Sequence, residues 1–343
     1  MRAMLLTGFG GYDQLVYRRE VPVPRPGAED VLIQVAACGV NNTDLWTREG
    51  AYGAGEPAGW QGGGFQFPRI QGADIVGRIA AVGARVSADR LGARVMVNPT
   101  LYAGEGEAGL FEATYLGSER DGGFAEFVCV PAQNAHVIDS ALSDAELATF
   151  MLVSLTAEHM LNRAAVAAGE TILITGASGG VGSALVQLAR LRGARVAALV
   201  GPGKEAPLRA LGVEAVLTRG EPEIAGALRR HWGAARVDVV ADTVAGAQVA
   251  QLVELLRVGG RYVTAGAIAG PHVTLDWRQL YLKHLTVLGS TMGTQAEARQ
   301  IVAHVAAGRL TPLLAGVYPL EQLVQAQQAF QRKTHFGKLV ITL

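Results

Sequence analysis

The sequence predicts an α/β protein of two domains, one rich in β-strands and one built on a doubly wound parallel sheet. Three observations support this fold class. The 343 residues exceed one ordinary domain, which spans ~100 to 200 residues. The first part of the chain carries short apolar runs separated by Gly- and Pro-rich turns. From Ser143 onward, apolar runs alternate with helix-compatible stretches, as in a parallel sheet covered on both faces.

The first half of the chain carries four runs that predict β-strands, at residues 31–37, 75–82, 94–97 and 124–130. Their spacing is typical of a barrel or a sandwich. Residues 51–64, AYGAGEPAGWQGGG, contain too much glycine for a packed element. We expect this segment to be either a plain surface loop or a flap over an active site.

The second half begins with a helix signal, because Ser143 is a good N-cap and Glu146 completes a capping box with it. The chain ends in a strand, GKLVITL, which is able to rejoin the first domain. We therefore predict one domain of residues 1–136 and 291–343 around an inserted domain of residues 137–290. The strands expected in the inserted domain are 172–175, 196–200, 215–217, 237–241, 262–265 and 286–288.

Composition narrows the classes of function. Only 17% of the residues are charged and the formal net charge is zero, which argues against a nucleic-acid partner and favours a small ligand. Cys38 and Cys129 each lie in an apolar run, as buried reduced thiols do, so a reducing compartment is expected. The apolar stretch at the N-terminus is too short for a signal peptide, and no run reaches the ~18 residues of a membrane span. We predict a cytoplasmic protein.

Residues 171–200 are the most informative segment, since they combine a strand, a glycine turn, an amphipathic helix and a second strand. Glycines at the turn allow the backbone to approach a pyrophosphate at the positive end of the helix. This segment therefore predicts dinucleotide binding. The residues expected at the phosphates are Ser178, Gly179, Gly180, Val181 and Gly182.

A second interpretation overlaps the first, because GASGG also fits the Gly-x-Ser-x-Gly turn of α/β hydrolases, with Ser178 as nucleophile. It requires an acid and a histidine after later strands, which Asp242 and either His272 or His284 would supply. It gives no reason for Gly182 or for a β-rich first domain. Dinucleotide binding remains the better interpretation.

The choice of cofactor is predicted from the end of the second strand. An NAD site places Asp or Glu there to bind the ribose 2′-hydroxyl, whereas this strand ends Val200-Gly201. Lys204 follows closely, and Arg219 follows the third strand. Both are able to neutralise a 2′-phosphate, although each is also explained as an ordinary exposed charge. We expect NADPH rather than NADH.

Six motifs together carry a resemblance over the whole chain. They are GVNNTDLWTREGAY at 39–52, GADIVGRIAAVG at 72–83, DGGFAEFVCVP at 121–131, the GGVG turn, LLRVGGRYVTAG at 255–266 and LTVLGSTMGT at 285–294. The chain resembles the zinc-independent, quinone oxidoreductase-like branch of the medium-chain dehydrogenase/reductase superfamily. The resemblance implies a chaperonin-10-like, β-rich catalytic domain joined to a Rossmann domain.

The zinc ligands of the related alcohol dehydrogenases are replaced in this sequence. Asn41 stands at the position of a ligand cysteine, Ala73 and Asp74 replace a His-Glu pair, and neither Leu152 nor Val153 replaces the last thiol. Zinc needs three protein ligands of nitrogen, sulfur or carboxylate type, so Asp74 alone does not hold it. The segment at the place of the four-cysteine structural lobe has no cysteine. We predict no metal site.

The resemblance also implies catalytic and cofactor contacts. Asp44 has the alternative role of a helix cap with Arg48 as its partner, and Trp46 stands where many quinone reductases carry a tyrosine. The residues expected near the substrate are Asn41, Thr43, Asp44 and Tyr52, and we expect Asn41, Thr43 and Tyr52 to bind the acceptor oxygen. The residues expected near the nicotinamide and its ribose are Gly266, Leu288, Gly289, Ser290 and Lys338.

Together these residues imply hydride transfer from NADPH to a small molecule, either a quinone or an α,β-unsaturated carbonyl. Without zinc, an alcohol oxygen is not made acidic at neutral pH, so reduction of an electrophilic acceptor is favoured. Two alternatives stay open: an alcohol dehydrogenase with an altered metal site, and a non-catalytic NADPH-binding protein. The family also implies a homodimer, with the sheet edge near LTVLGS as the expected interface.

Overall fold

The structure is a computed structural model, and it describes residues 1–52, 65–104, 106–220 and 223–343. Residues 53–64 of the predicted loop or flap lie outside this part of the chain. None of the described helices is both long enough and apolar enough to cross a membrane.

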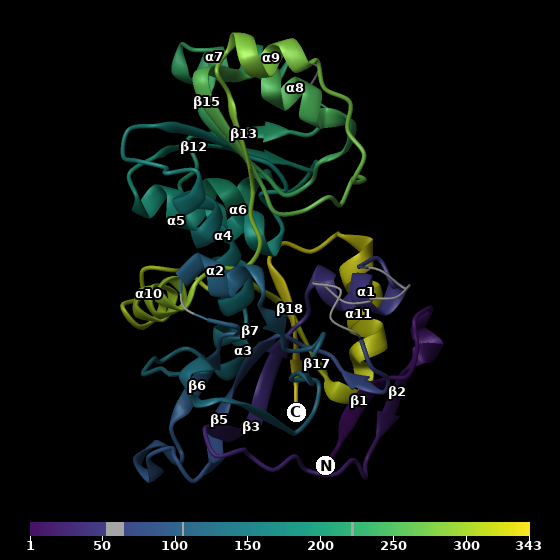
Figure 1. Cartoon of the computed structure of the whole chain (residues 1–343). Helices are drawn as coiled ribbons and strands as arrows, with labels where there is room; N and C mark the ends of the chain where they lie inside the picture. Colours follow the sequence, from purple (N-terminus) through teal and green to yellow (C-terminus); the bar gives the residue numbers. More distant parts are fainter. Residues whose placement is uncertain (53–64, 105, 221–222) are drawn as a thin grey trace. The chain divides into compact units, whose positions relative to one another are not determined.

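The described chain divides into two compact units (Figure 1). Unit 1 comprises Met1–Leu152 and Thr294–Leu343, and unit 2 comprises Val153–Gly293. The boundaries lie later in the chain than the predicted limits at residues 136 and 290. The reason is visible at helix α3 (Asp144–Leu147), which packs on strand β3 of unit 1 and whose Asp144 accepts a hydrogen bond of 2.6 Å from Arg94.

Unit 1 is built on strands, as the sequence predicts. Among the described residues, seven strands form one sheet in the order β10-β6-β5-β3-β18-β17, with β9 pairing with β3, and β2-β1-β4 form a smaller sheet. The strands are β1 (Ala3–Leu6), β2 (Leu15–Arg18), β3 (Asp30–Gly39), β4 (Arg69–Ile70), β5 (Asp74–Val82), β6 (Arg94–Val97), β7 (Thr100–Leu101), β8 (Thr114–Tyr115), β9 (Phe127–Pro131), β10 (Ala135–Val137), β17 (Leu314–Pro319) and β18 (Lys338–Thr342).

Strand β3 is the centre of this unit, since it pairs antiparallel with β5, β9 and β18. Val31, Ile33 and Val35 alternate along it and are buried, as the two-residue period of a strand requires. Ile341 of the last strand lies opposite Cys38. The C-terminal strand therefore rejoins the first domain, as the sequence predicts.

Three of the described helices of unit 1 begin at capping boxes, at Asn41, Ser143 and Thr294. The predicted capping box is present, because Ser143 N donates to Glu146 at 2.8 Å and Glu146 N donates to Ser143 Oγ at 3.2 Å. The helices are α1 (Asn42–Glu49), α2 (Gly106–Phe111), α3, α10 (Gln295–Ala306) and α11 (Leu323–Arg332), with short 3-10 turns η1 (Tyr12–Gln14), η2 (Ala88–Arg90), η3 (Ala132–Asn134) and η5 (Leu320–Gln322).

Unit 2 is a doubly wound fold. Its described residues form a six-stranded, wholly parallel sheet in the order β13-β12-β11-β14-β15-β16. The strands are β11 (Thr171–Ile174), β12 (Arg195–Val200), β13 (Ala215–Thr218), β14 (Val237–Asp242), β15 (Leu256–Thr264) and β16 (Thr286–Gly289). The connecting elements are α4 (Met151–Arg163, which spans the unit boundary), α5 (Gly180–Leu191), α6 (Glu205–Ala210), α7 (Ile224–Trp232), η4 (Gly246–Gln248), α8 (Val249–Glu254) and α9 (Trp277–Leu282).

Helices cover both faces of this sheet, with α5 and α6 on one side and α7, α8 and α9 on the other (Figure 1). On the second side, Leu228 of α7 and Leu252 of α8 share a buried cluster with strand residues such as Leu217. The strand order reverses between β11 and β14. In such sheets the ligand lies outside the carboxyl ends of the strands at this reversal.

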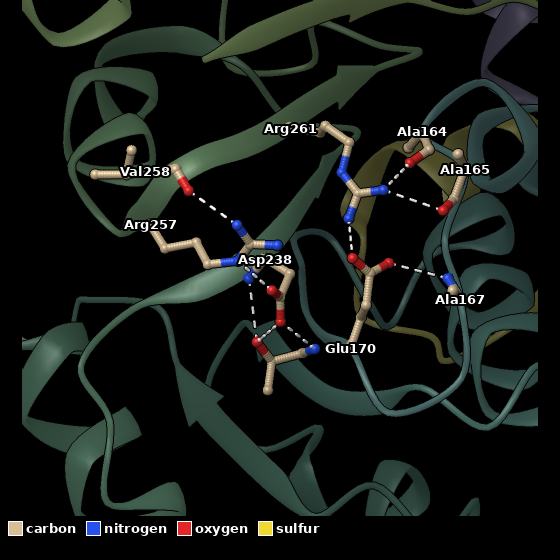
Figure 2. A network of polar contacts seen from close by, with 9 residues as sticks. Ala164, Ala165, Ala167, Glu170, Asp238, Arg257, Val258 and Arg261 are labelled. Atoms are coloured by element: carbon tan, nitrogen blue, oxygen red, sulfur yellow. Dashed lines mark hydrogen bonds and ion pairs between the residues drawn. The ribbon is translucent and has the colours of Figure 1, made fainter. Parts of the chain in front are cut away.

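The amino ends of the same strands are closed by a network of charged side chains, shown in Figure 2. Asp238 of β14 accepts hydrogen bonds from Arg257 of β15 and from both the backbone and the hydroxyl of Thr171, the latter two at 2.7 and 2.6 Å. Arg261 of β15 binds Glu170 and the carbonyl oxygens that follow α4. These contacts hold three central strands together at their amino ends. The predicted cofactor residues lie at the carboxyl ends of the strands.

Candidate functional site

The predicted phosphate turn joins β11 to the first turn of α5. The helix begins at Gly180, and Gly179 before it is extended, with φ −85° and ψ 173° and no side-chain cap. The first backbone N–H groups of a helix have no partner within the helix, and its dipole makes this end positive. Gly180, Val181 and Gly182 therefore present N–H groups suited to a pyrophosphate, with Ser178 one residue before the cap.

Two glycines of this turn are required by close approaches. Gly176 has a φ of +57°, and a Cβ added to it would lie 2.5 Å from Thr243 Oγ1. A Cβ on Gly182 would lie 2.2 Å from the carbonyl oxygen of Gly176. Gly182 is thus needed because the helix packs tightly against its own turn.

Beneath the turn lies a buried carboxylate with a full set of donors. Asp242, at the end of β14, accepts from the hydroxyls of Thr175 and Tyr262 and, at 2.8 Å, from the backbone N–H of Val244. Burial and the nearby Asp242 raise the pKa of Tyr262, which keeps its hydroxyl protonated as a donor. Neither candidate histidine is among the donors to this carboxylate, and both are exposed. Asp242 therefore supports the turn, and the hydrolase interpretation loses its acid.

This supporting role of Asp242 was not predicted from the sequence. An available signal was the pair Asp242-Thr243 at the carboxyl end of a buried strand next to the reversal of strand order. Polar side chains at that position either bind ligand or brace the loops that bind it.

The end of β12 gathers positive charge. Arg219 N donates to Val200 O at 2.6 Å, and a Cβ on Gly201 would lie 3.8 Å from Arg219 Nη2. Lys204 is the N-cap residue of α6, and burial together with Arg219 lowers its pKa. The two predicted cations therefore lie close enough together to interact.

Glu205, the next residue after Lys204, is a carboxylate that the sequence analysis overlooked. Its Oε1 accepts from Thr218 Oγ1 at 3.1 Å and from Gly203 N at 3.2 Å. It lies in α6 rather than at the strand end, where the rule for NAD sites looks for an acid. The string GPGKE at residues 201–205 was the signal in the sequence that a carboxylate lies close to the end of β12.

The predicted nicotinamide contacts lie at the ends of β15 and β16. Thr264 is opposite Gly289 across the two strands, and Ser290 N donates to Thr264 O at 2.9 Å. Ser290 Oγ is buried and has no hydrogen-bond partner among the described residues. Leaving a buried hydroxyl unpaired costs ~1 to 3 kcal/mol, so a polar ligand group fits this position.

The cofactor residues of unit 2 thus share one edge of the sheet. Each set follows the carboxyl end of a strand: Ser178 to Gly182 after β11, Lys204 after β12, Arg219 after β13, Gly266 after β15, and Leu288 to Ser290 at the end of β16. A helix N-terminus, two cations and an unpaired hydroxyl along this edge fit a dinucleotide. Lys338, also predicted to contact the cofactor, belongs to unit 1.

Unit 1 brings two predicted catalytic residues into a buried polar cluster with Asp74 and Lys338. Asn41 is the N-cap of α1, and its backbone N–H donates to Asp44 Oδ2 at 2.7 Å. Asn41 Nδ2 donates to Asp74 Oδ2 at 3.0 Å and to Gly39 O at 3.2 Å. Lys338 Nζ donates to Asn41 Oδ1 and, at 2.7 Å, to Asp74 Oδ2. All four side chains of the cluster are buried.

Thr43, in the first turn of α1, contacts Tyr52, which follows the helix. The helix ends at Gly50, which is left-handed with a φ of 73°, and the chain turns back there. The side chains of Tyr52 and Thr43 share a hydrogen bond, and burial raises the pKa of Tyr52 to about 12. The Trp46 ring meets the Tyr52 ring edge-on, 5.8 Å between centroids. Two hydroxyl groups, those of Thr43 and Tyr52, therefore lie close together beside the ring of Trp46.

Asp44 performs the capping role that was left open for it, but Arg48 is not its partner. Burial raises the pKa of Asp44 to about 7, against the opposing effect of the hydrogen bond from Asn41 N. Arg48 instead donates to Gly10 O and, at 3.2 Å, to Gln327 Oε1. The alternative of an Arg48–Asp44 pair is therefore wrong, because α11 and the N-terminal segment offer Arg48 acceptors that are distant in sequence.

The described residues contain no group of three His, Cys, Asp or Glu side chains arranged to hold a metal. Asp74, at the position of the family's His-Glu pair, accepts from Lys338, Asn41 and, at 2.7 Å, Leu152 N. Its oxygens are thus engaged with protein donors. The absence of zinc stays a prediction.

Comparisons with known proteins agree with this architecture. The family described as "Alcohol dehydrogenase GroES-like domain" matches residues 27–140, and "Zinc-binding dehydrogenase" matches residues 180–307. The quinone oxidoreductase of Lama guanicoe is 31% identical over 353 residues, covering 100% of this chain and 98% of the relative.

Two solved structures add to this. A putative alcohol dehydrogenase from Sinorhizobium meliloti is 51% identical with a TM-score of 0.94, over 100% of this chain and 96% of that one. The 2-octenoyl-CoA carboxylase reductase CinF, in complex with NADP and 2-octenoyl-CoA, is 26% identical with a TM-score of 0.88, over 99% and 87%. The chain therefore belongs to the medium-chain dehydrogenase/reductase superfamily, is similar to its quinone oxidoreductases, and is an oxidoreductase with a nicotinamide cofactor.

Proposed function

We propose that the protein is an NADPH-dependent reductase that passes a hydride to a quinone or to an α,β-unsaturated carbonyl without zinc. The observation that carries the proposal is the positive end of β12, where Lys204 and Arg219 lie together and the strand itself ends without a carboxylate. A 2′-phosphate needs such charge, whereas a ribose diol needs an acid. The NADP complex of CinF and the quinone oxidoreductase relatives support the same conclusion.

The chain has a suitable residue for each part of the cofactor. The N–H groups at the start of α5 would bind the pyrophosphate, Lys204 and Arg219 the 2′-phosphate, and Ser290 Oγ a polar group at the nicotinamide end. NADPH supplies the hydride, and the protein supplies binding, orientation and electrostatics.

The acceptor would be bound by the hydroxyl groups of unit 1. Thr43 and Tyr52 share a hydrogen bond, which uses one of their two hydroxyl hydrogens. One of the two hydroxyls would therefore donate to the acceptor oxygen as it becomes negative, and the other would hold it in place. Such a donor is worth ~3 to 4 kcal/mol at most in a water-poor site. Burial raises the pKa of Tyr52 to about 12, so its hydroxyl stays protonated at neutral pH and is able to donate a hydrogen bond, while the same shift opposes complete transfer of its proton. Asn41 and Asp44 complete the proposed site, since they form the capping box that holds the turn with Thr43.

The proposed reaction is tested with purified protein, both nicotinamide cofactors and a panel of acceptors. The panel contains 1,4-benzoquinone, 9,10-phenanthrenequinone, 2-alkenals and simple alcohols, with and without a strong chelator. We expect sustained NADPH oxidation with a quinone or an alkenal that survives chelation. Binding without turnover would instead support a non-catalytic protein, and alcohol oxidation abolished by chelation would support an alcohol dehydrogenase with an altered metal site.

Cofactor choice is tested separately by Lys204→Met. A charge-assisted phosphate contact contributes ~1.5 to 3 kcal/mol, so NADPH binding should weaken roughly tenfold or more while NADH binding stays the same. Lys283→Met is the matched control, because Lys283 precedes β16 and binds Glu254 O at the opposite edge of the sheet. Equal losses for both cofactors in Lys204→Met would contradict the assignment.

We also propose that the protein is a homodimer through unit 2. Strand β16 ends the sheet and its Val287 is exposed, as are Trp277 and Leu282 of α9, at 70% and 66%. Pairing two such edges would satisfy backbone groups and cover this apolar surface. Light scattering at micromolar concentration should show a dimer, which Leu282→Glu disrupts and Leu91→Glu, at an exposed leucine of unit 1, does not. A monomeric wild-type protein would refute the proposal.

A further inference from the structure

Lys338 is a buried lysine at the start of β18 whose ammonium group donates to two acceptors of unit 1. Its side chain is 4% exposed and that of its partner Asp74 is not exposed at all. A buried charge is tolerated only when it is paired and hydrogen-bonded. Asp74 supplies the opposite charge at 2.7 Å, and Asn41 Oδ1 supplies a second acceptor.

The ammonium group determines which way the Asn41 amide faces. An ammonium group has donors only, so the amide must turn its oxygen toward Lys338. This sends Nδ2 toward Gly39 O and Asp74 Oδ2, at 3.2 and 3.0 Å. The two hydrogens of Nδ2 are then both used, and Asn41 keeps no amide hydrogen for a substrate oxygen.

Asn41 in turn fixes the first turn of α1. It is the N-cap residue, and it closes a capping box with Asp44. Thr43 lies between these two residues, so the box sets the position of its hydroxyl. The far end of the helix is held independently, because Arg48 binds Gly10 O and Gln327.

We propose that Lys338 is a positioning residue for the proposed reduction: by orienting the Asn41 amide it places the first turn of α1, and with it Thr43, for the acceptor. This inference rests on the proposed function. It differs from the direct cofactor contact that the family resemblance implies for Lys338. A displacement of ~1 Å at a reacting group is able to lower turnover by ~100-fold, so the effect should be measurable.

The test replaces Lys338 with methionine and measures acceptor turnover and cofactor binding separately. We expect kcat for the quinone to fall roughly tenfold to a hundredfold, with the Kd for NADPH unchanged within about twofold. Lys338→Arg keeps a buried cation with donors and should recover part of kcat. Lys283→Met, at a lysine of unit 2 that donates to Glu254 O, is the control. A loss of NADPH affinity with kcat unchanged at saturating NADPH would overturn the proposal in favour of a cofactor contact.

Lys338→Met leaves Asp74 as an unpaired buried charge, and this variant is at risk of misfolding. The double variant Lys338→Met/Asp74→Leu removes both charges, so no unpaired charge stays buried, and the contact that it gives up elsewhere is the one from Leu152 N to Asp74. It should fold and bind NADPH normally, yet retain the low kcat, because the Asn41 amide keeps only its bond to Gly39 O and its oxygen has lost the Lys338 donor. Wild-type kcat in the double variant would show that Lys338 only neutralises Asp74, which overturns the proposal.

Hydrogen exchange separates this inference from the proposed function. In the double variant, a peptide covering residues 39–49 should exchange roughly tenfold faster than in the wild-type protein, while a peptide covering α5 should be unchanged. This readout needs no substrate, so it remains decisive even if the wild-type protein reduces none of the acceptors. Unchanged exchange over residues 39–49 would refute the control of α1 by Lys338.

Discussion

Replacing Asp44 with asparagine should remove a pH dependence of folding that arises in the capping box of α1. Burial raises the pKa of this carboxyl from 3.8 to about 7, while the hydrogen bond from Asn41 N and the charge of Lys338 act in the opposite direction. A carboxyl group whose pKa rises on folding binds protons more tightly in the native state. Its stabilising contribution is therefore fully present below the unfolded value of 3.8 and is lost as the pH rises through about 7.

The size of the effect follows from the two pKa values. The limiting slope is ~1.4 kcal/mol per pH unit, and it declines as the native group begins to titrate. Between pH 5 and pH 7 the wild-type protein should lose about 2 kcal/mol of unfolding free energy through this group. The side-chain amide that Asp44→Asn introduces does not titrate, so the variant should lack this loss.

Urea unfolding followed by tryptophan fluorescence, at fixed ionic strength from pH 5 to 7.5, measures the difference. Other groups titrate in both proteins and cancel in the comparison; one is His136, whose pKa burial lowers to about 4. Asp89→Asn, at an exposed carboxyl of the same unit, is the control and should follow the wild-type curve. If Asp44→Asn and wild type run parallel across this range, the buried titration of Asp44 is refuted.

Three further outcomes are expected. Elemental analysis of the purified protein should find no stoichiometric zinc, because Asn41 and Asp74 are hydrogen-bonded to Lys338. About one zinc per chain would contradict this expectation. Thr43→Val should lower quinone turnover roughly tenfold to a hundredfold at unchanged NADPH affinity, whereas Thr47→Val, one turn along the same helix, should not; equal activities would remove Thr43 from the site. Gly182→Ala should weaken NADPH and NADH binding alike, since its Cβ would lie 2.2 Å from Gly176 O, and wild-type affinity in a titration would contradict that geometry.

Much of the architecture was predictable because its causes are local. The strand–turn–helix pattern at residues 171–200 and the Ser143–Glu146 capping box depend on residues a few positions apart, and both are present as predicted. The carboxyl ends of parallel strands necessarily share one edge of a sheet. Residues placed after successive strands, such as Lys204 and Arg219, were therefore expected to gather there.

Other features depended on contacts that no local pattern encodes. Asp74 and Lys338 are 264 positions apart, and only the antiparallel return of β18 onto β3 brings them into one buried pair with Asn41. Arg48 likewise binds Gln327, 279 positions away, rather than its near neighbour Asp44.

The sequence by itself determined which residue types are available: a glycine turn for phosphates, cations after the strands, and hydroxyl and amide groups in place of zinc ligands. Only the tertiary structure decided which of those groups already have hydrogen-bond partners within the protein. A buried donor or acceptor must find a partner, and that partner is chosen by whichever strand or helix packs beside it. For this reason Asp242 braces the phosphate turn and the Asn41 amide is turned toward Lys338, while Ser290 Oγ is left without a partner among the described residues.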